Sequence, residues 1–199
     1  MVDSINNLAV LLGSSWGSGV NLYLTIAGLG IAHRLQWTTL PGNMDTLAHP
    51  IVIAVAVLMY LVEFFADKIP YVDSVWDSIH TLIRPIGGSM MGYMASADIA
   101  PAIQIPIAVL TGAIALDSHL TKATARAAIN TSPEPVTNSI ASVAEDAGVL
   151  GALYLTLCHP VILTILVIVF IVFSIWFLVK MFHLVKSVFR KKRTQPSTP

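Results

Sequence analysis

The segment from Val161 to Val179 constrains the fold of this chain most strongly, because it contains no charged residue. Pro160 precedes it, Lys180 follows it, and only Thr164 and Ser174 interrupt its apolar character. A helix that crosses a lipid bilayer needs about 20 predominantly apolar residues. Since both hydroxyl side chains can hydrogen-bond within their own helix, the segment predicts a transmembrane helix.

The composition of the whole chain supports a membrane environment. Hydrophobic residues make up 55% of the 199 residues and charged residues only 11%, and the mean hydropathy is +0.76. A soluble domain carries about 25% charged residues, so we expect the lipid bilayer to be the solvent for much of this protein. The net formal charge of zero gives no reason to expect a nucleic-acid partner. The single cysteine, Cys158, leaves no disulfide partner within the chain.

Further apolar segments bring the predicted number of transmembrane helices to about six. The segments lie at about Leu8–Ala32, Ile51–Ala66, Pro85–Ala97, Ala102–Leu116 and Val136–Cys158. Pro85–Ala97 is short and contains three glycines, so it either crosses thinly or enters as a re-entrant half-helix. The sequence therefore predicts an all-α membrane protein with a broken or re-entrant segment. We expect one transmembrane domain over residues 1–185 and a disordered basic cytoplasmic tail over residues 186–199.

The distribution of basic residues predicts the orientation, because lysine and arginine favour the cytoplasmic side of a membrane. With six crossings, ten of the eleven basic residues fall on one side, and only Arg34 falls on the other. This predicts that both termini lie in the cytoplasm (N-in, C-in). If the segment Pro85–Ala97 is re-entrant, the N-terminus moves to the opposite side and the asymmetry weakens.

The first polar stretch follows the apolar segment that ends near Ala66. Glu63 and Asp67 are four residues apart and therefore share a helix face. Asp73 and Asp77 repeat this spacing on a second helix, with Arg84 nearly two turns further on. The pattern predicts that these side chains form part of a binding site for a substrate or an ion.

The second polar stretch runs from Asp117 to Asp146. Its polar side chains recur at spacings of three and four residues, which also places them on shared helix faces. The candidate site residues in it are Arg126, Asn130, Glu134, Asn138, Glu145 and Asp146.

The cost of burying charge in a membrane predicts that the two stretches meet. A charged side chain at the centre of a bilayer costs about 3 kcal/mol on insertion scales, so such residues usually face a bundle interior and pair. Glu63, Glu145 and Asp146 lie deepest in apolar sequence, and we take these three as candidates for holding a bound cation. Asn21 can either hydrogen-bond between helices or line a path. For Asp67 and its neighbours, purely structural ion pairs remain an alternative.

The same residues carry a resemblance to a known family. The chain resembles the bacterial membrane proteins grouped as domain of unknown function 4126. The shared pieces include Gly19–Tyr23, Glu63–Asp77 and the run Asn130–Pro135 (NTSPEP), and the resemblance covers roughly residues 8 to 180. It implies a small, multi-pass protein of the bacterial inner membrane and supplies no activity.

We expect a small membrane transporter or channel that is linked to a cation or a proton and forms a homo-oligomer. One alternative is a lipid-handling membrane enzyme or lipid translocator, in which Arg84, Arg126 and Lys122 bind a phosphate headgroup and an Asp or Glu acts as a base. Another is a membrane scaffold with no substrate. The sequence favours a non-enzyme, because it has no phosphate-cradling loop, no Gly-x-Ser-x-Gly motif and no dinucleotide fingerprint.

Overall fold

The computed structural model describes residues 2–130 and 135–193, and over these ranges its regular secondary structure is helix, joined by turns and short irregular segments. Proline opens every α-helix after the first, at the position where its missing N–H would be unpaired anyway. The residue before a proline also avoids the helical region, so each of these prolines separates two helices. The elements are α1 (Val2–Arg34), the 3₁₀ helix η1 (Met44–Ala48), α2 (Pro50–Ala66), α3 (Pro70–Ala95), α4 (Pro101–Ile129), α5 (Pro135–Cys158) and α6 (Pro160–Arg193).

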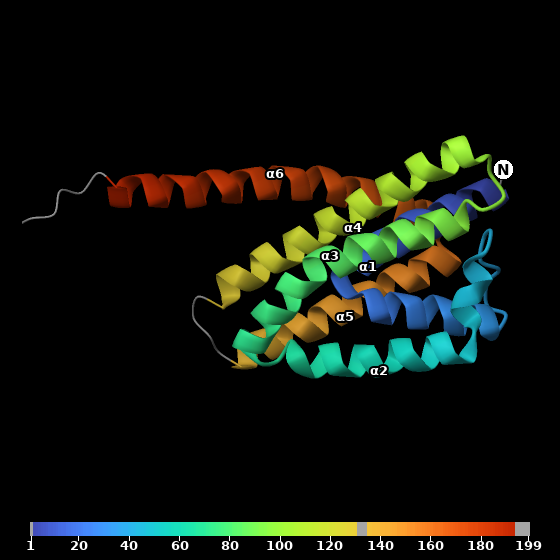
Figure 1. Ribbon diagram of the computed structural model, residues 1–199, viewed down its shortest axis with the longest axis horizontal. Helices are drawn as coiled ribbons and strands as arrows, with labels where there is room; N and C mark the ends of the chain where they lie inside the picture. The colour runs from blue at the N-terminus through green and yellow to red at the C-terminus, as the bar shows by residue number, and fades with distance from the viewer. Residues whose placement is uncertain (1, 131–134, 194–199) are drawn as a thin grey trace, which may run out of the picture.

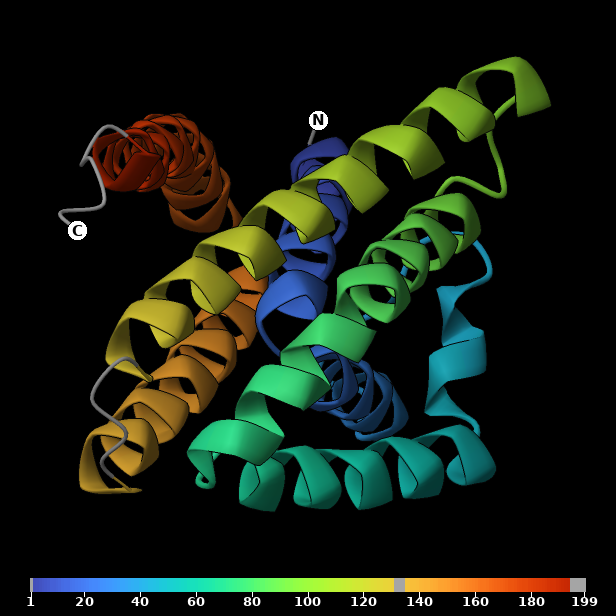
Figure 2. The ribbon, with the colours of Figure 1, turned by 60° about the vertical axis from the view of Figure 1, so that its left-hand side comes forward.

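Helices α2 to α6 run alternately between two ends of a bundle (Figure 1). One end, which we call the Lys68 end, holds the α2–α3 connection and the C-terminal part of α6. The other, which we call the Arg34 end, holds the end of α1, η1 and the α3–α4 connection. Figure 2 shows that the C-terminal part of α6 stands apart from the rest of the bundle. The first half of α6 packs against α1, where Leu163 and Val167 form a buried cluster with Ala9.

Helix α1 is two half-helices that fold back on each other at Asn21. The backbone there is extended, with φ −148° and ψ 97°. Gly13, before the break, packs against Thr156 of α5, and Gly28, after the break, packs against Leu153 about one turn away on α5. Both halves therefore reach the Arg34 end, and the break lies in the middle of the bundle (Figure 1).

This hairpin corrects the prediction that Leu8–Ala32 is one straight crossing. The Asn21 side chain caps the second half, since its Oδ1 accepts a hydrogen bond from the backbone N–H of Leu24 at 2.9 Å. Gly17 packs against Thr25, so the two halves are in direct contact. Because α1 doubles back, the two termini lie at opposite ends of the bundle (Figure 1). This differs from the predicted N-in, C-in arrangement, in which both termini share one side.

The segment predicted as a separate thin or re-entrant element, Pro85–Ala97, is instead mostly the second half of the long helix α3. Its glycines allow close packing with neighbouring helices. Gly92 lies against Thr111 of α4, and Gly88 lies against Ala115 of the same helix. The glycines therefore serve helix packing in a continuous helix.

Three helical segments are long and apolar enough to cross a membrane: Pro101–Ile129, Val136–Cys158 and Pro160–Ser187. Pro50–Ala66 is a shorter apolar helix. Large hydrophobic side chains remain exposed along α6, as expected for a surface that faces lipid. These features make the chain a membrane protein with transmembrane helices. Helix α6 also continues to Arg193, within the region predicted as a tail, and residues 194–199 lie outside the described part of the chain.

Candidate functional site

Nine ionisable side chains from α2 to α5 and the α2–α3 connection meet inside the bundle. Eight are buried, and the ninth, Glu145, has a side chain only 20% exposed. We call this set the charged network. It consists of Glu63, Asp67, Asp73, Asp77, Arg84, Lys122, Arg126, Glu145 and Asp146.

Arg84 joins α3 to three other helices from a fully buried position. One terminal nitrogen donates a hydrogen bond to Glu63 at 2.8 Å, and the same nitrogen lies 3.6 Å from Asp77. The other donates to the backbone carbonyl of Gly19 at 2.9 Å and lies 3.0 Å from His119 Nδ1. The guanidinium therefore holds α1, α2, α3 and α4 together.

Lys122 is surrounded by three carboxylates. Its Nζ lies 3.2 Å from Asp67, 3.3 Å from Glu145 and 3.7 Å from Glu63. It also donates a hydrogen bond to the backbone carbonyl of Val20 at 3.2 Å. One ammonium thus links residues of α1, α2 and α5, together with the residue that follows α2.

Arg126 forms the outermost cationic part of the network. Its Nε and a terminal nitrogen donate to the two carboxylate oxygens of Glu145 at 2.9 and 3.0 Å. This two-point geometry is the strong form of an arginine–carboxylate pair. Arg126 also lies 3.3 Å from Asp67 and 3.9 Å from Asp73, and it donates to the backbone carbonyl of Asn138 at 3.0 Å.

The broken helix α1 ends in the charged network. The carbonyls of Gly19 and Val20, at the C-terminal end of the first half, accept hydrogen bonds from cationic side chains. At the start of the second half, the Asn21 amide donates to Asp146 at 3.0 Å. The cationic side chains thus lie at a helix C-terminus, which carries a partial negative charge. The Asp146 carboxylate lies near a helix N-terminus, which carries a partial positive charge. Non-helical backbone at membrane depth is tolerated where protein buries it in this way.

The charges of the network do not balance. Six carboxylates face the three cationic side chains of the network and Lys68 beside it, whose charge interacts with Asp146 and Asp67, so a formal excess of two negative charges remains if all ten groups are ionised. Several buried polar atoms also have no hydrogen-bond partner among the described residues. They include Glu63 Oε2, Asp67 Oδ1, Arg84 Nε and both polar atoms of the Asn138 amide. The network can therefore accept further donors and further positive charge.

A polar pocket of about 210 Å³ between α3 and α4 reaches the edge of the network. It is lined by Asp73, Ser74, Asp77, Ser78, Thr81, Ala123, Arg126 and Ala127. Asp73, in the first turn of α3 at the Lys68 end, lies outside the spanning segments. Burial raises the pKa of Asp73 to about 6, although Arg126 and the Asn130 hydrogen bond oppose that shift. The Glu63 carboxylate, deeper in the bundle, is not part of the pocket lining.

The structure brings together eleven of the twelve residues predicted for the site. Asn130 donates to Asp73 at 2.8 Å, and Asn138 and Asn21 contact the network as described above. The twelfth, Glu134, lies outside the described residues. That these residues bind a substrate or an ion stays a prediction.

The predicted site residues do not include His119 and Tyr60, and they include Lys122 only as a phosphate ligand in the lipid-handling alternative. Tyr60 donates to Asp146 at 3.1 Å, and His119 lies between Arg84 and Thr81. Their spacing held a signal, since His119, Lys122 and Arg126 recur at three and four residues.

The three residues predicted to hold a cation have separate partners. Glu63 pairs with Arg84, Glu145 pairs with Arg126, and Asp146 accepts from Tyr60 and Asn21. Over the described ranges, no group of three or more His, Cys, Asp or Glu side chains is arranged to hold a metal ion. A multidentate metal site therefore finds no support in this arrangement.

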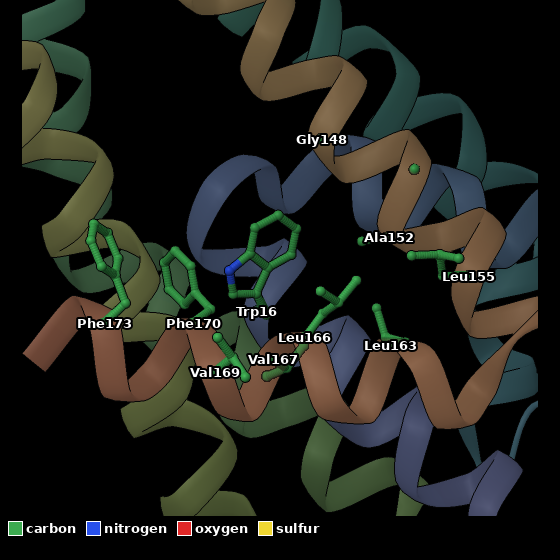
Figure 3. A pocket seen from close by; sticks show the side chains of 11 residues that line it. Trp16, Gly148, Ala152, Leu155, Leu163, Leu166, Val167, Val169, Phe170 and Phe173 are labelled. Carbon is green, nitrogen blue, oxygen red and sulfur yellow. The ribbon is translucent and has the colours of Figure 1, made fainter.

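A second cavity, of about 490 Å³, lies between α1, α5 and α6 (Figure 3). Its lining is aliphatic and aromatic, with Trp16 meeting the edge of Phe170 at a ring separation of 5.7 Å. No charged side chain lines it. We therefore place the candidate site in the charged network.

Comparison with known families supports the resemblance seen in the sequence. The family model described as "Domain of unknown function (DUF4126)" matches residues 8–180. The chain belongs to the DUF4126 family. The matched region contains every residue of the charged network, while the last part of α6 lies beyond it. No curated protein and no solved structure matches this DUF4126 protein.

Proposed function

We propose that this DUF4126 protein is a small membrane transporter or channel for a cation or a proton, and that the charged network holds the transported charge. One observation carries the proposal. Six carboxylates face four cationic side chains, the three of the network and Lys68 beside it, in a bundle of apolar helices.

The physical reason is the cost of unbalanced buried charge. A buried carboxylate without a compensating charge or hydrogen bond takes up a proton or recruits a cation. With Lys68 counted, the network therefore needs up to two further positive charges to be neutral. Protons and small cations can leave and return, unlike the side chains of Arg84 and Lys122, and such exchange is the elementary step of transport.

A transported cation fits the network better than an anion does. Arg84, Lys122 and Arg126 are each already paired with carboxylates. A phosphate headgroup would have to displace these partners, which disfavours the lipid-handling alternative. The scaffold alternative expects a fully paired cluster, whereas Glu63 Oε2 and Asp67 Oδ1 lack hydrogen-bond partners among the described residues.

We further propose that the Lys68 end faces the cytoplasm, with the N-terminus on the outer side of a bacterial inner membrane. Lys68, Lys180 and Lys186 lie toward this end, whereas Arg34 lies at the other. This arrangement keeps the preference of basic residues for the cytoplasmic side. The expected homo-oligomer belongs to the same proposal.

Flux into liposomes tests the proposed transport. Purified protein is reconstituted, and uptake of protons, Na⁺, K⁺ and small organic cations is measured against empty liposomes. We expect flux of at least one cation in the wild type, and loss of that flux in Glu63→Gln and Asp146→Asn. Asp98→Asn is the matched control, because Asp98 is exposed in the α3–α4 connection at the Arg34 end. Flux equal to that of empty liposomes for the whole panel, or full flux in both network variants, would overturn the proposal.

A further inference from the structure

We propose that the pocket between α3 and α4 binds a small monovalent alkylammonium ion. This inference rests on the proposed function and names the class of cation that its site accepts. The pocket lies where the charged network comes nearest to the outside of α3 and α4, since Asp73, Asp77 and Arg126 belong to both.

Two buried carboxylates supply the acceptors. Asp73 and Asp77 are one turn apart on α3, both line the pocket, and they are only 0% and 5% exposed. Asp77 Oδ1 lies 3.6 Å from Arg84, and Asp73 Oδ1 lies 3.9 Å from Arg126. Both distances exceed hydrogen-bond length, and neither oxygen has a hydrogen-bond partner among the described residues. Each can therefore accept an N–H from a bound cation.

The charge of the lining selects a monovalent ion. Asp73 and Asp77 contribute two negative charges, and Arg126 contributes one positive charge. The lining thus carries one net negative charge, which one ammonium group neutralises. Because Arg126 stands in the same pocket, a divalent cation would meet repulsion as well as attraction.

The lining also favours a cation that donates hydrogen bonds and has a short alkyl group. The Ser78 hydroxyl donates to the Ser74 carbonyl at 2.8 Å, so its oxygen remains able to accept. An ammonium group has three N–H donors, enough for the two carboxylates and this hydroxyl. On the α4 side, the methyl groups of Ala123 and Ala127 form an apolar wall for the alkyl part.

The size of the pocket limits the alkyl group. Its volume of about 210 Å³ corresponds to roughly seven water molecules at about 30 Å³ each. Methylammonium and ethylammonium fit this volume together with a few waters. A bare metal ion would leave most of it to water and would find too few carboxylate ligands, since the described residues include no metal-binding group.

Isothermal titration calorimetry on the full chain in detergent tests the pocket directly. The probes are methylammonium and ethylammonium, with tetramethylammonium as a control of equal charge that has no N–H donor. We expect both alkylammonium ions to bind the wild type and tetramethylammonium to give no heat. Asp77→Asn should weaken binding by about tenfold or more, as expected for loss of a charge-assisted hydrogen bond.

A second variant protects the test against misfolding of Asp77→Asn. Ala127 is exposed on α4, so Ala127→Leu should fold normally while its larger side chain fills the pocket. We expect it to exclude ethylammonium. Asp98→Asn, outside the pocket, should bind like the wild type. Three outcomes would overturn the inference. They are equal heats for methylammonium and tetramethylammonium, no heat with either alkylammonium ion, and unchanged binding in both pocket variants.

The outcomes separate this inference from the proposed function. Alkylammonium binding that depends on Asp77, without cation flux in liposomes, would leave the pocket standing and remove the transport proposal. Flux that depends on Glu63, without alkylammonium binding, would support the transport proposal and remove the alkylammonium pocket.

Discussion

Arg84 donates a hydrogen bond to Glu63 across 2.8 Å, and neither side chain is exposed to solvent. The two residues are 21 positions apart in the sequence and belong to different helices. A buried pair of this kind ties the structure of α2 to that of α3, because each charge depends on the other for its neutralisation.

Removing the charge of Arg84 should destabilise the protein strongly. Arg84→Gln removes the nearest cation of Glu63 and leaves only Lys122, at 3.7 Å, beside this carboxylate. Breaking a buried pair by removing one partner costs about 3–5 kcal/mol. The double variant Glu63→Gln/Arg84→Gln should lose less than the sum of the two single variants, since it removes both charges. Unfolding free energies in detergent measure both effects.

Arg34→Gln is the control for Arg84, because Arg34 is exposed and its loss should change stability by less than about 0.5 kcal/mol. Strict additivity in the double variant would show that Glu63 and Arg84 do not interact.

The hairpin of α1 predicts a short distance between two positions that are far apart in sequence. Leu8 and Ile31 are partly exposed, at 44% and 37%, and suit spin labels introduced as cysteines after Cys158→Ser. A straight helix would separate them by about 35 Å at 1.5 Å per residue. Because the two half-helices return to the same end, we expect a much shorter distance by pulsed electron paramagnetic resonance. A distribution centred near the value for a straight helix would contradict the hairpin.

Ser174 supplies a polar contact between α6 and α4. Its hydroxyl donates to the Asp117 carboxylate of α4, beyond the apolar cluster of Leu163 and Val167 with Ala9 that packs the first half of α6 against α1. Ser174→Ala removes this donor and should increase hydrogen–deuterium exchange in α6. Thr164→Ala is the matched control, since the Thr164 hydroxyl donates only within α6, to the Pro160 carbonyl. Equal exchange in the two variants would show that the Ser174 contact does not hold the helix.

The pKa of Asp73, raised to about 6 by burial, predicts a pH dependence of stability. The folded protein binds this proton more tightly than the unfolded chain, in which the ordinary pKa is about 3.9. The protonated carboxyl therefore contributes stability that is fully present below about pH 4 and lost as the pH rises through 6. Relative to Asp73→Asn, which cannot titrate, the wild type should lose melting temperature between about pH 4 and 6 and then level off.

Thermal unfolding in detergent at a series of pH values measures this difference. Asp98→Asn is the control, because it shows how much the melting temperature changes with pH when an exposed carboxylate is removed. A gap between wild type and Asp73→Asn that is constant with pH, or that widens in favour of the wild type as the pH rises, would refute the assignment to Asp73.

The charged network could be foreseen because membrane burial makes unpaired charge costly. The spacing of Glu63 and Asp67, and of Arg126 and Asn130, placed their side chains on shared faces. The free-energy cost of unpaired charge in a membrane then predicted that these polar faces contact each other. The ion pairs of Arg84 with Glu63 and of Arg126 with Glu145 agree with that prediction. The spacing of four residues also placed Lys122 on the polar face of Arg126 and Asn130, and Lys122 lies between Asp67 and Glu145 in the structure.

The hairpin of α1 could not be foreseen from local sequence. An apolar run with small residues is equally suited to a crossing and to two half-helices. The contacts that stabilise the break are distant in sequence. Asn21 donates to Asp146, which is 125 residues away, and Arg84 and Lys122 donate to the carbonyls of Gly19 and Val20. The α3 helix was misjudged for a related reason, since the contacts of Gly88 and Gly92 with α4 turn apparent helix breakers into packing positions.

The carbonyls of Gly19 and Val20 are bonded to the same two cations that neutralise Glu63 and Asp67. Arg84 and Lys122 consequently cannot change carboxylate partners without stretching or breaking their bonds to the tip of the hairpin. The ion pairs of these carboxylates and the backbone position at the centre of the bundle are therefore mechanically coupled, and a probe placed on α1 should report on the state of carboxylates that lie outside α1.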